Sequence, residues 1–140
     1  MKLFSLDQIR KWDDFTIKNE PISSIELMER ASKTASNWII NQFGKRNTTI
    51  LILIGCGNNG GDGLAIARIL SKNGFKVDIY YLNLNKISND NKINYEKINF
   101  NDVKLLNTSD LKEIKESKYS IIIDSLFGSG LNRKIEGEAK

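Results

Sequence analysis

The sequence has 140 residues, of which 40% are hydrophobic and 27% are charged, a length and composition that suit one soluble domain with its own core. It contains no histidine and one cysteine, Cys56. Serine–histidine and cysteine–histidine catalysis, most zinc sites and an internal disulfide are therefore excluded within this chain. The net charge is +4, but lysine and arginine are interleaved with acidic residues, a pattern that argues against nucleic-acid binding.

Membrane association is not expected from the hydropathy pattern. No apolar run approaches the ~20 residues that span a bilayer. The amino-terminal residues lack the apolar region and the cleavage site of a signal peptide. We therefore expect a cytoplasmic protein.

Two helices are expected first, because capping boxes begin at Ser5 and Ser23 and apolar residues then recur at helical spacing. Strands alternate with helices in the rest of the chain, an order that favours parallel strands joined by right-handed crossovers. We expect an α/β fold: a Rossmann-like, doubly wound, mostly parallel sheet in three αβα layers, preceded by the two helices. The expected helices are 5–18, 23–43, 64–73, 88–98 and 108–116, and the expected strands are 48–54, 75–81, 103–106 and 119–124.

The most informative motif is GCGNNGGDG at 55–63, between a buried strand and a helix. Ligands of open α/β sheets bind at the carboxyl ends of the strands, and helix amino termini attract phosphate. Asn58, Asn59 and Asp62 also bring oxygen atoms, which hard cations prefer. The structural alternative is a tight strand–helix turn in which Asn58 and Asn59 tolerate left-handed backbone and Asp62 caps the helix.

The same segment satisfies the G-x-G-x-x-G spacing of dinucleotide-binding proteins. That motif is weak without an acidic residue at the end of the second strand, about 20 residues further on, which would bind the ribose. Here the strand ends in Tyr81, Leu82 and Asn83, and Asp78 lies inside it. An ordinary NAD-dependent oxidoreductase is therefore the weaker interpretation, and a P-loop is excluded because no Gly-Lys-Ser/Thr follows.

A second polar loop, DSLFGSGLNR at 124–133, follows the fourth expected strand. Asp124 stands at the carboxyl end of that strand and would lie near Asn59 if the two strands are neighbours. Arg133 could bind a phosphate through paired hydrogen bonds. The alternative is a capped loop with a solvated arginine.

Together with the helical Met-Glu-Arg-Ala segment at 28–31, these loops resemble the NAD(P)H-hydrate epimerase family, also called the YjeF N-terminal domain. The family's Gly-x-Gly-Asn-Asn-Gly-Gly-Asp-Gly loop matches 55–63, and its Asp-x-Leu-Phe-Gly-x-Gly-Leu-x-Arg loop matches 124–133. The order and spacing of the motifs fit across nearly the whole chain.

The resemblance implies an isomerase of nicotinamide-nucleotide repair, which interconverts the R and S forms of hydrated NADH and NADPH (NADHX and NADPHX). It implies a potassium ion bound by Asn59 and Asp124. It also implies that the NAD(P)H-hydrate dehydratase is the functional partner and that the protein can form a homodimer. Asp62 is the candidate proton carrier, and catalysis in the family needs such a group. The implied substrate-binding residues are Asn58, Asn59, Gly60, Gly61, Asp62, Gly128, Ser129, Gly130, Leu131, Asn132, Arg133 and Lys134.

The chain departs from the family at its carboxyl end. Family members continue past this point with an Asp-x-Pro-Ser-Gly segment, whereas the only proline here is Pro21. We therefore expect residues 1–140 to form one domain of this family that lacks its carboxyl-terminal part. This leaves a second interpretation open, in which the chain is a nucleotide-binding module without turnover or an inactive fragment of the enzyme.

Overall fold

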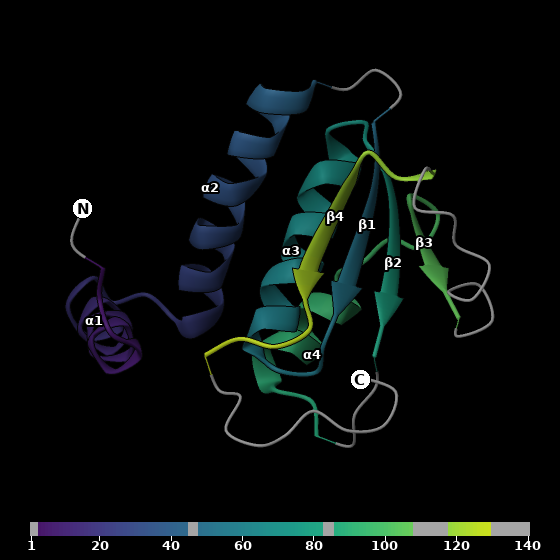
Figure 1. Cartoon of the computed structure of the whole chain (residues 1–140). Coiled ribbons are helices and arrows are strands. Elements are labelled where there is room, and N and C mark those ends of the chain that lie inside the picture. Colours follow the sequence, from purple (N-terminus) through teal and green to yellow (C-terminus); the bar gives the residue numbers. More distant parts are fainter. Residues whose placement is uncertain (1–2, 45–47, 83–85, 108–117, 130–140) are drawn as a thin grey trace.

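Four parallel strands form the central sheet of the computed structural model, in the order β3-β2-β1-β4 (Figure 1). The structure describes residues 3–44, 48–82, 86–107 and 118–129. The first strand is central because it is nearly all apolar and is buried on both faces. The strands are β1 (Thr49–Ile54), β2 (Lys76–Tyr81), β3 (Val103–Leu106) and β4 (Ile121–Ser125).

The helices begin and end close to the predicted residues, with one exception. Both predicted capping boxes form, at Ser5 and at Ser23, and Gly44 ends the second helix with a positive φ of 62°. The helices are α1 (Leu6–Asn19), α2 (Ser24–Phe43), α3 (Asn58–Lys72) and α4 (Asn89–Glu96). The predicted helix at 108–116 lies outside the described residues.

The exception is α3, which begins at Asn58 rather than at Leu64. The sequence predicted a glycine-rich loop up to residue 63, and glycine has in general a poor helix propensity. Tertiary packing outweighs that propensity, because a Cβ at Gly61 would lie 2.9 Å from the Met28 sulfur and one at Gly63 would lie 2.7 Å from Ser125. The glycines let α3 pack closely on its neighbours, which positions the polar residues of its first turns.

The core lies on both faces of the sheet. On one face the central strand contributes Ile50, Ile52 and Ile54, which pack with Leu64 and Leu70 of α3. That helix contacts α2 on one side and α4 on the other (Figure 1). The opposite face carries a smaller cluster around Leu51, Tyr80, Leu82, Leu106 and Tyr119. The parallel α/β fold is therefore confirmed.

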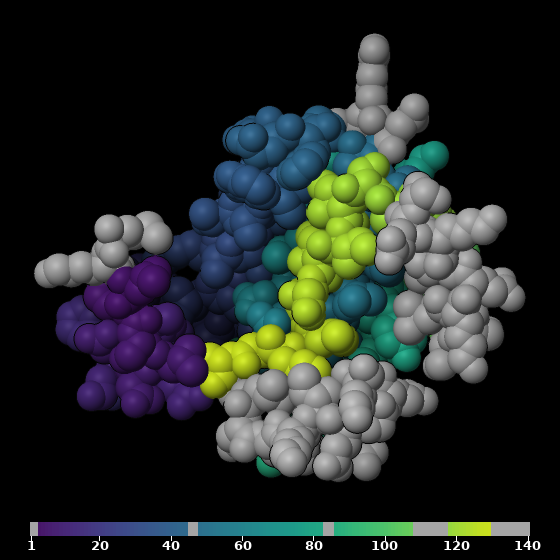
Figure 2. Space-filling model, in the orientation of Figure 1, coloured from purple at the N-terminus to yellow at the C-terminus, as the bar shows by residue number. Residues whose placement is uncertain are grey.

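The first helix stands to one side of this body (Figure 1). None of its residues is buried, although Phe4 and Trp12 stack edge-to-face with ring centroids 5.2 Å apart. The Arg10 guanidinium donates a hydrogen bond to the Ser129 carbonyl, at 3.1 Å. Figure 2 shows the loop after β4 reaching α1 at this contact.

Candidate functional site

The glycine-rich turn leaves β1 at the carboxyl end of the sheet and enters α3 directly. Gly57 is the N-cap, with an extended φ of −85° and no side-chain cap, so the interpretation that Asp62 caps this helix is wrong. A Cβ at Gly55 would clash with the Leu126 carbonyl oxygen, and one at Gly60 would clash with the Gly55 carbonyl oxygen. These close approaches explain why glycine occupies both positions.

The structure brings the second loop against this turn, because β4 is a direct neighbour of β1. The Gly55 amide donates to the Ser125 carbonyl at 3.0 Å. The Asn59 side-chain amide donates to the Phe127 carbonyl at 3.1 Å. The two strands are neighbours, as the expectation for Asp124 required, and the contact that the structure gives Asn59 in the second loop is the one to Phe127.

The carboxylate of Asp124 holds the second loop in shape. Its Oδ1 accepts a hydrogen bond from the Leu126 amide at 2.9 Å, and its side chain is exposed. Strand pairing matches Asp124 with Leu53 and Ser125 with Ile54. Ser125 is buried beside Gly63 of α3, so the alternation of side chains along a strand puts Asp124 on the opposite face.

The Asp62 carboxylate sits one turn into α3, partly buried under α2. The buried Ser32 hydroxyl of α2 lies 3.4 Å from both the carboxylate Oδ1 and the backbone carbonyl of Asp62. Burial raises the pKa of Asp62 to about 6; the Ser32 hydrogen bond lowers it, and the charges of Asp13 and Asp90 raise it further. Both protonation states of Asp62 are therefore populated not far below neutral pH, as a proton carrier requires.

The other predicted residues of the turn differ in exposure. Asn58 is exposed, whereas Gly60 and Gly61 are buried. Because glycine has no side chain, these two residues can offer a ligand only their backbone groups. Gly128 lies against Asn59, since a Cβ there would be 3.0 Å from the Asn59 Cβ. The five predicted residues from Gly130 to Lys134 lie outside the described residues.

The helical Met-Glu-Arg-Ala segment supports the site from behind. Met28 packs on Gly61, since a Cβ at Gly61 would lie 2.9 Å from the Met28 sulfur. Glu29 forms an ion pair with Arg68 of α3, and Arg30 pairs with Glu20 at 2.7 Å. This segment of α2 therefore fixes the position of α3.

Asp78, the only acidic residue on β2, is already engaged by other side chains. Its Oδ2 accepts hydrogen bonds from the Lys118 ammonium at 2.8 Å and from the Tyr119 hydroxyl at 2.6 Å. The same carboxylate, as the strongest influence, raises the pKa of Lys118. This engagement weighs further against a ribose-binding acid of the oxidoreductase type.

Sequence reasoning missed Asn91, which binds the glycine-rich turn from the other side, and Tyr81, which binds Asn91. Asn91 of α4 is fully buried, and its amide donates to the Gly55 carbonyl at 2.8 Å and to the Gly57 carbonyl at 2.9 Å. The Tyr81 hydroxyl donates to Asn91 Oδ1 at 2.8 Å. The sequence did contain a signal for these residues. Tyr81 occupies the end of the second strand, where a dinucleotide-binding protein has an acidic residue, and Asn91 and Asn94 lie on one side of an expected helix.

Within the described ranges, no helix is both long and apolar enough to cross a bilayer. In the same part of the chain, histidine, cysteine, aspartate and glutamate form no cluster of three that could hold a metal ion.

These features define a parallel α/β protein whose glycine-rich strand–helix turn meets a second post-strand loop at the ligand-binding end of the sheet. The family described as YjeF-related protein N-terminus matches residues 24–140. The chain belongs to this family.

Curated relatives carry consistent names. The NAD(P)H-hydrate epimerase of Limosilactobacillus reuteri (strain ATCC 55730 / SD2112) is 34% identical over 136 residues, which cover 97% of this chain and 63% of the relative. That of Oenococcus oeni is 36% identical, covering 96% and 62%. The bifunctional NAD(P)H-hydrate repair enzyme Nnr of Dictyoglomus turgidum is 38% identical, covering 100% and 27%.

A solved structure confirms the fold. The crystal structure of yeast ynu0, YNL200c, superposes with a TM-score of 0.82 at 24% sequence identity and covers 99% of this chain and 61% of that one. The chain thus spans 61–63% of the length of this protein and of the epimerases of L. reuteri and O. oeni.

Proposed function

We propose that this chain carries the substrate-binding part of an isomerase that interconverts the R and S forms of hydrated NADH and NADPH. The observation that carries the proposal is the junction of the two loops through Asn59 and Phe127, with Asp62 in the adjoining turns of α3. The names of the relatives support the same activity.

In this proposal the dinucleotide lies across the carboxyl ends of β1 and β4. Asn58, Asn59 and the backbone of Gly60 and Gly61 contact it from one side, and Gly128 and Ser129 contact it from the other. The further residues that the resemblance implies, 130–134, lie outside the described residues. Asp62 moves the proton: its neutral acid protonates the departing ring hydroxyl, the C–O bond breaks and water leaves. Water then adds to the other face of the ring carbon and returns its proton to the carboxylate, so atoms and charge balance.

Potassium belongs to the proposal as well. The donor chemistry fits, because the Asn59 amide nitrogen is bound to Phe127 and leaves its oxygen for a cation, while Asp124 has a second carboxylate oxygen beyond the one bound to Leu126. Asn59 and Asp124 would hold the ion. Bound there, it would supply positive charge that orders the two loops.

The proposed substrates are NADHX and NADPHX, and the proposed functional partner is a dehydratase, which consumes one of the epimers. The bifunctional relative, which is named a repair enzyme, supports this link. The expected homodimer and the cytoplasmic location stay predictions. Sedimentation velocity of the purified chain tests the first, and fractionation of the source cells tests the second.

One assay tests the activity: the epimers of hydrated NADPH are separated by chromatography after incubation with the chain, with and without potassium. We expect interconversion that is faster with potassium, and Asp124→Ala should remove the potassium dependence. Binding without interconversion supports the alternative, a nucleotide-binding module without turnover. An interconversion rate of the unsubstituted chain that does not change with potassium concentration contradicts the assignment of a potassium site to Asn59 and Asp124.

A further inference from the structure

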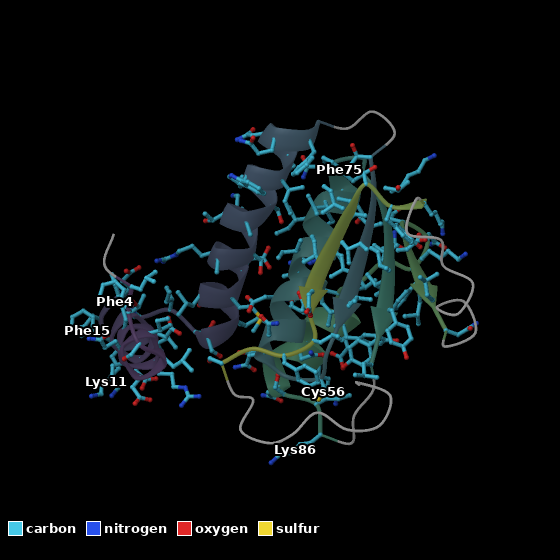
Figure 3. All side chains as sticks on the ribbon, in the orientation of Figure 1. Phe4, Lys11, Phe15, Cys56, Phe75 and Lys86 are labelled. Carbon is cyan, nitrogen blue, oxygen red and sulfur yellow. The ribbon has the colours of Figure 1, made fainter. Side chains whose placement is uncertain are left out.

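The start of α4 binds the carbonyls of Gly55, Cys56 and Gly57, the three residues that join β1 to α3. The Asn91 side-chain amide donates hydrogen bonds to the carbonyls of Gly55 and Gly57. The backbone amide of Ser88 donates to the Cys56 carbonyl at 2.9 Å. Figure 3 shows Cys56 and Lys86 at the same end of the molecule, where the chain approaches α4.

The side chain of Asn91 is enclosed and hydrogen-bonded on both sides of its amide group. It is fully buried, and it sits so close to Gly60 that a Cβ at that position would lie 2.7 Å from its amide nitrogen. The carbonyls of Gly55 and Gly57 fix which way the amide faces, because both need its N–H groups. The Tyr81 hydroxyl then donates to the amide oxygen on the other side. Burial, with smaller contributions from Cys56 and Tyr95, raises the pKa of Tyr81 to about 12, so the phenol remains a donor.

Fixing the carbonyls also fixes the amides. In a trans peptide the N–H points opposite to the C=O of the same plane, and no cis bond is present among the described residues. Three carbonyls directed at α4 therefore turn the N–H groups of Cys56, Gly57 and Asn58 away from it. These N–H groups lead into the amino terminus of α3, where a phosphate is attracted.

We propose that Tyr81 and Asn91 are positioning residues, which hold the carbonyls of the glycine-rich turn against α4 and so present its N–H groups to the diphosphate of the dinucleotide. This inference rests on the proposed function for the identity of that ligand. It places a tyrosine–asparagine pair at the strand end where an oxidoreductase would use a ribose-binding acid. The turn is thereby aligned before the ligand arrives, which reduces the entropy lost on binding.

The experiment compares Asn91→Leu with Asn94→Leu in the full chain. Asn94 is a matched control, because it is equally buried on the same helix but its amide donates a hydrogen bond to the Met28 sulfur, at 3.2 Å, and not to the turn. Its Oδ1 finds no partner among the described groups. The probe is ADP-ribose, which has the diphosphate but no nicotinamide, and its dissociation constant is measured by calorimetry.

We expect Asn91→Leu to weaken ADP-ribose binding roughly tenfold, which corresponds to about one lost hydrogen bond between the turn and the ligand. Asn94→Leu should leave the dissociation constant unchanged. Tyr81→Phe, which removes one hydroxyl and keeps the fold even if Asn91→Leu does not, should weaken binding by roughly threefold. With hydrated NADPH, KM should rise while kcat stays the same, because the binding lost is common to ground and transition states.

Equal affinity in wild type and Tyr81→Phe, or parallel losses in Asn91→Leu and Asn94→Leu, would overturn the proposal. A fall in kcat at constant KM would also overturn it. Failure of the proposed function gives a different pattern: the unsubstituted chain binds ADP-ribose but does not interconvert the epimers. In that case the affinities alone decide the roles of Tyr81 and Asn91.

Discussion

Asn59 and Phe127 are joined by a hydrogen bond of 3.1 Å from the asparagine amide to the phenylalanine carbonyl. The bond links the first turn of α3 to the loop after β4, so one side chain ties together the two motifs that define the candidate site. It also fixes the direction of the Asn59 amide, whose oxygen is then left for a ligand.

Asn59→Ala is expected to destabilise the chain and to weaken binding at the site. The Phe127 carbonyl would lose its partner, which lowers the free energy of unfolding by about 1 kcal/mol. Urea denaturation measures that change, and Asn58→Ala is the control for stability because Asn58 is exposed. Equal losses in the two variants would contradict the role given to this bond.

The contact between Gly63 and Ser125 offers a second test, independent of any ligand. A Cβ at Gly63 would lie 2.7 Å from both the Cβ and the Oγ of Ser125, and neither the strand nor the helix can move freely. Gly63→Ala should therefore destabilise the chain by about 1–3 kcal/mol through overpacking.

A second substitution should repair that damage. In the Gly63→Ala background, Ser125→Gly removes both clashing atoms and should recover part of the lost stability, whereas Ser125→Ala keeps the Cβ and should recover less. Melting temperatures of the three variants give the order. Recovery by Ser125→Ala as large as that by Ser125→Gly would mean that the Cβ contact is not the cause.

The pKa of Asp62, raised by burial to about 6 from an ordinary 3.8, predicts a pH-dependent stability. Above pH 6 the carboxylate is charged in both states and its burial destabilises the fold; below about pH 4 it is neutral in both and the penalty disappears. Stability of the wild type should therefore rise as the pH falls from about 6 to 4, relative to Asp62→Asn.

The magnitude of this effect is modest. The shift alone corresponds to at most about 3 kcal/mol, and solvent screening of the partly exposed carboxylate reduces it to the order of 1 kcal/mol. Chemical denaturation of wild type and Asp62→Asn at pH 8 and pH 4 measures it: the variant should be the more stable protein at pH 8, and the gap should close at pH 4. A gap that is the same at both pH values would refute the raised pKa.

Epimerisation should follow the same titration if Asp62 carries the proton. The rate is then expected to bend near pH 6, where the acid and its carboxylate are equally populated. Asp13→Asn removes a negative charge that raises the pKa of Asp62, so the bend should move to lower pH. A rate profile that does not respond to Asp13→Asn would argue for another proton carrier.

The sheet and its order of elements could be predicted from local patterns. Capping boxes at Ser5 and Ser23 and the apolar run of β1 depend on neighbouring residues alone, and all three formed as expected. The meeting of Asn59 with the second loop followed from a topological rule, because parallel neighbours share their carboxyl ends. It required only that β1 and β4 be adjacent, which they are.

The start of α3 and the role of Asn91 could not be predicted in this way. Glycine has a low helix propensity, so local patterns do not predict a helix there. Glycine is needed at 61 and 63 because Met28 and Ser125 approach these positions too closely for a Cβ. From the sequence alone, Asn91 cannot be distinguished from an exposed polar residue on a surface helix. In the folded chain, tertiary contacts bury it completely. Both features depend on contacts between residues far apart in the sequence.

The ion pair between Glu29 and Arg68 gives the last prediction, since it joins the two helices that carry Met28 and Asp62. The Arg68 side chain is only 14% exposed, and its Nε has no hydrogen-bond partner among the described groups. Glu29→Ala would leave this guanidinium without its acceptor, at a cost of about 1–3 kcal/mol of unfolding free energy. Glu20→Ala breaks the Arg30 pair, whose side chains are both more than half exposed, and should change stability by less than about 1 kcal/mol. Thermal unfolding of the two variants in the same buffer makes the comparison, and a loss in Glu20→Ala as large as that in Glu29→Ala would show that burial of Arg68 is not what gives the pair its strength.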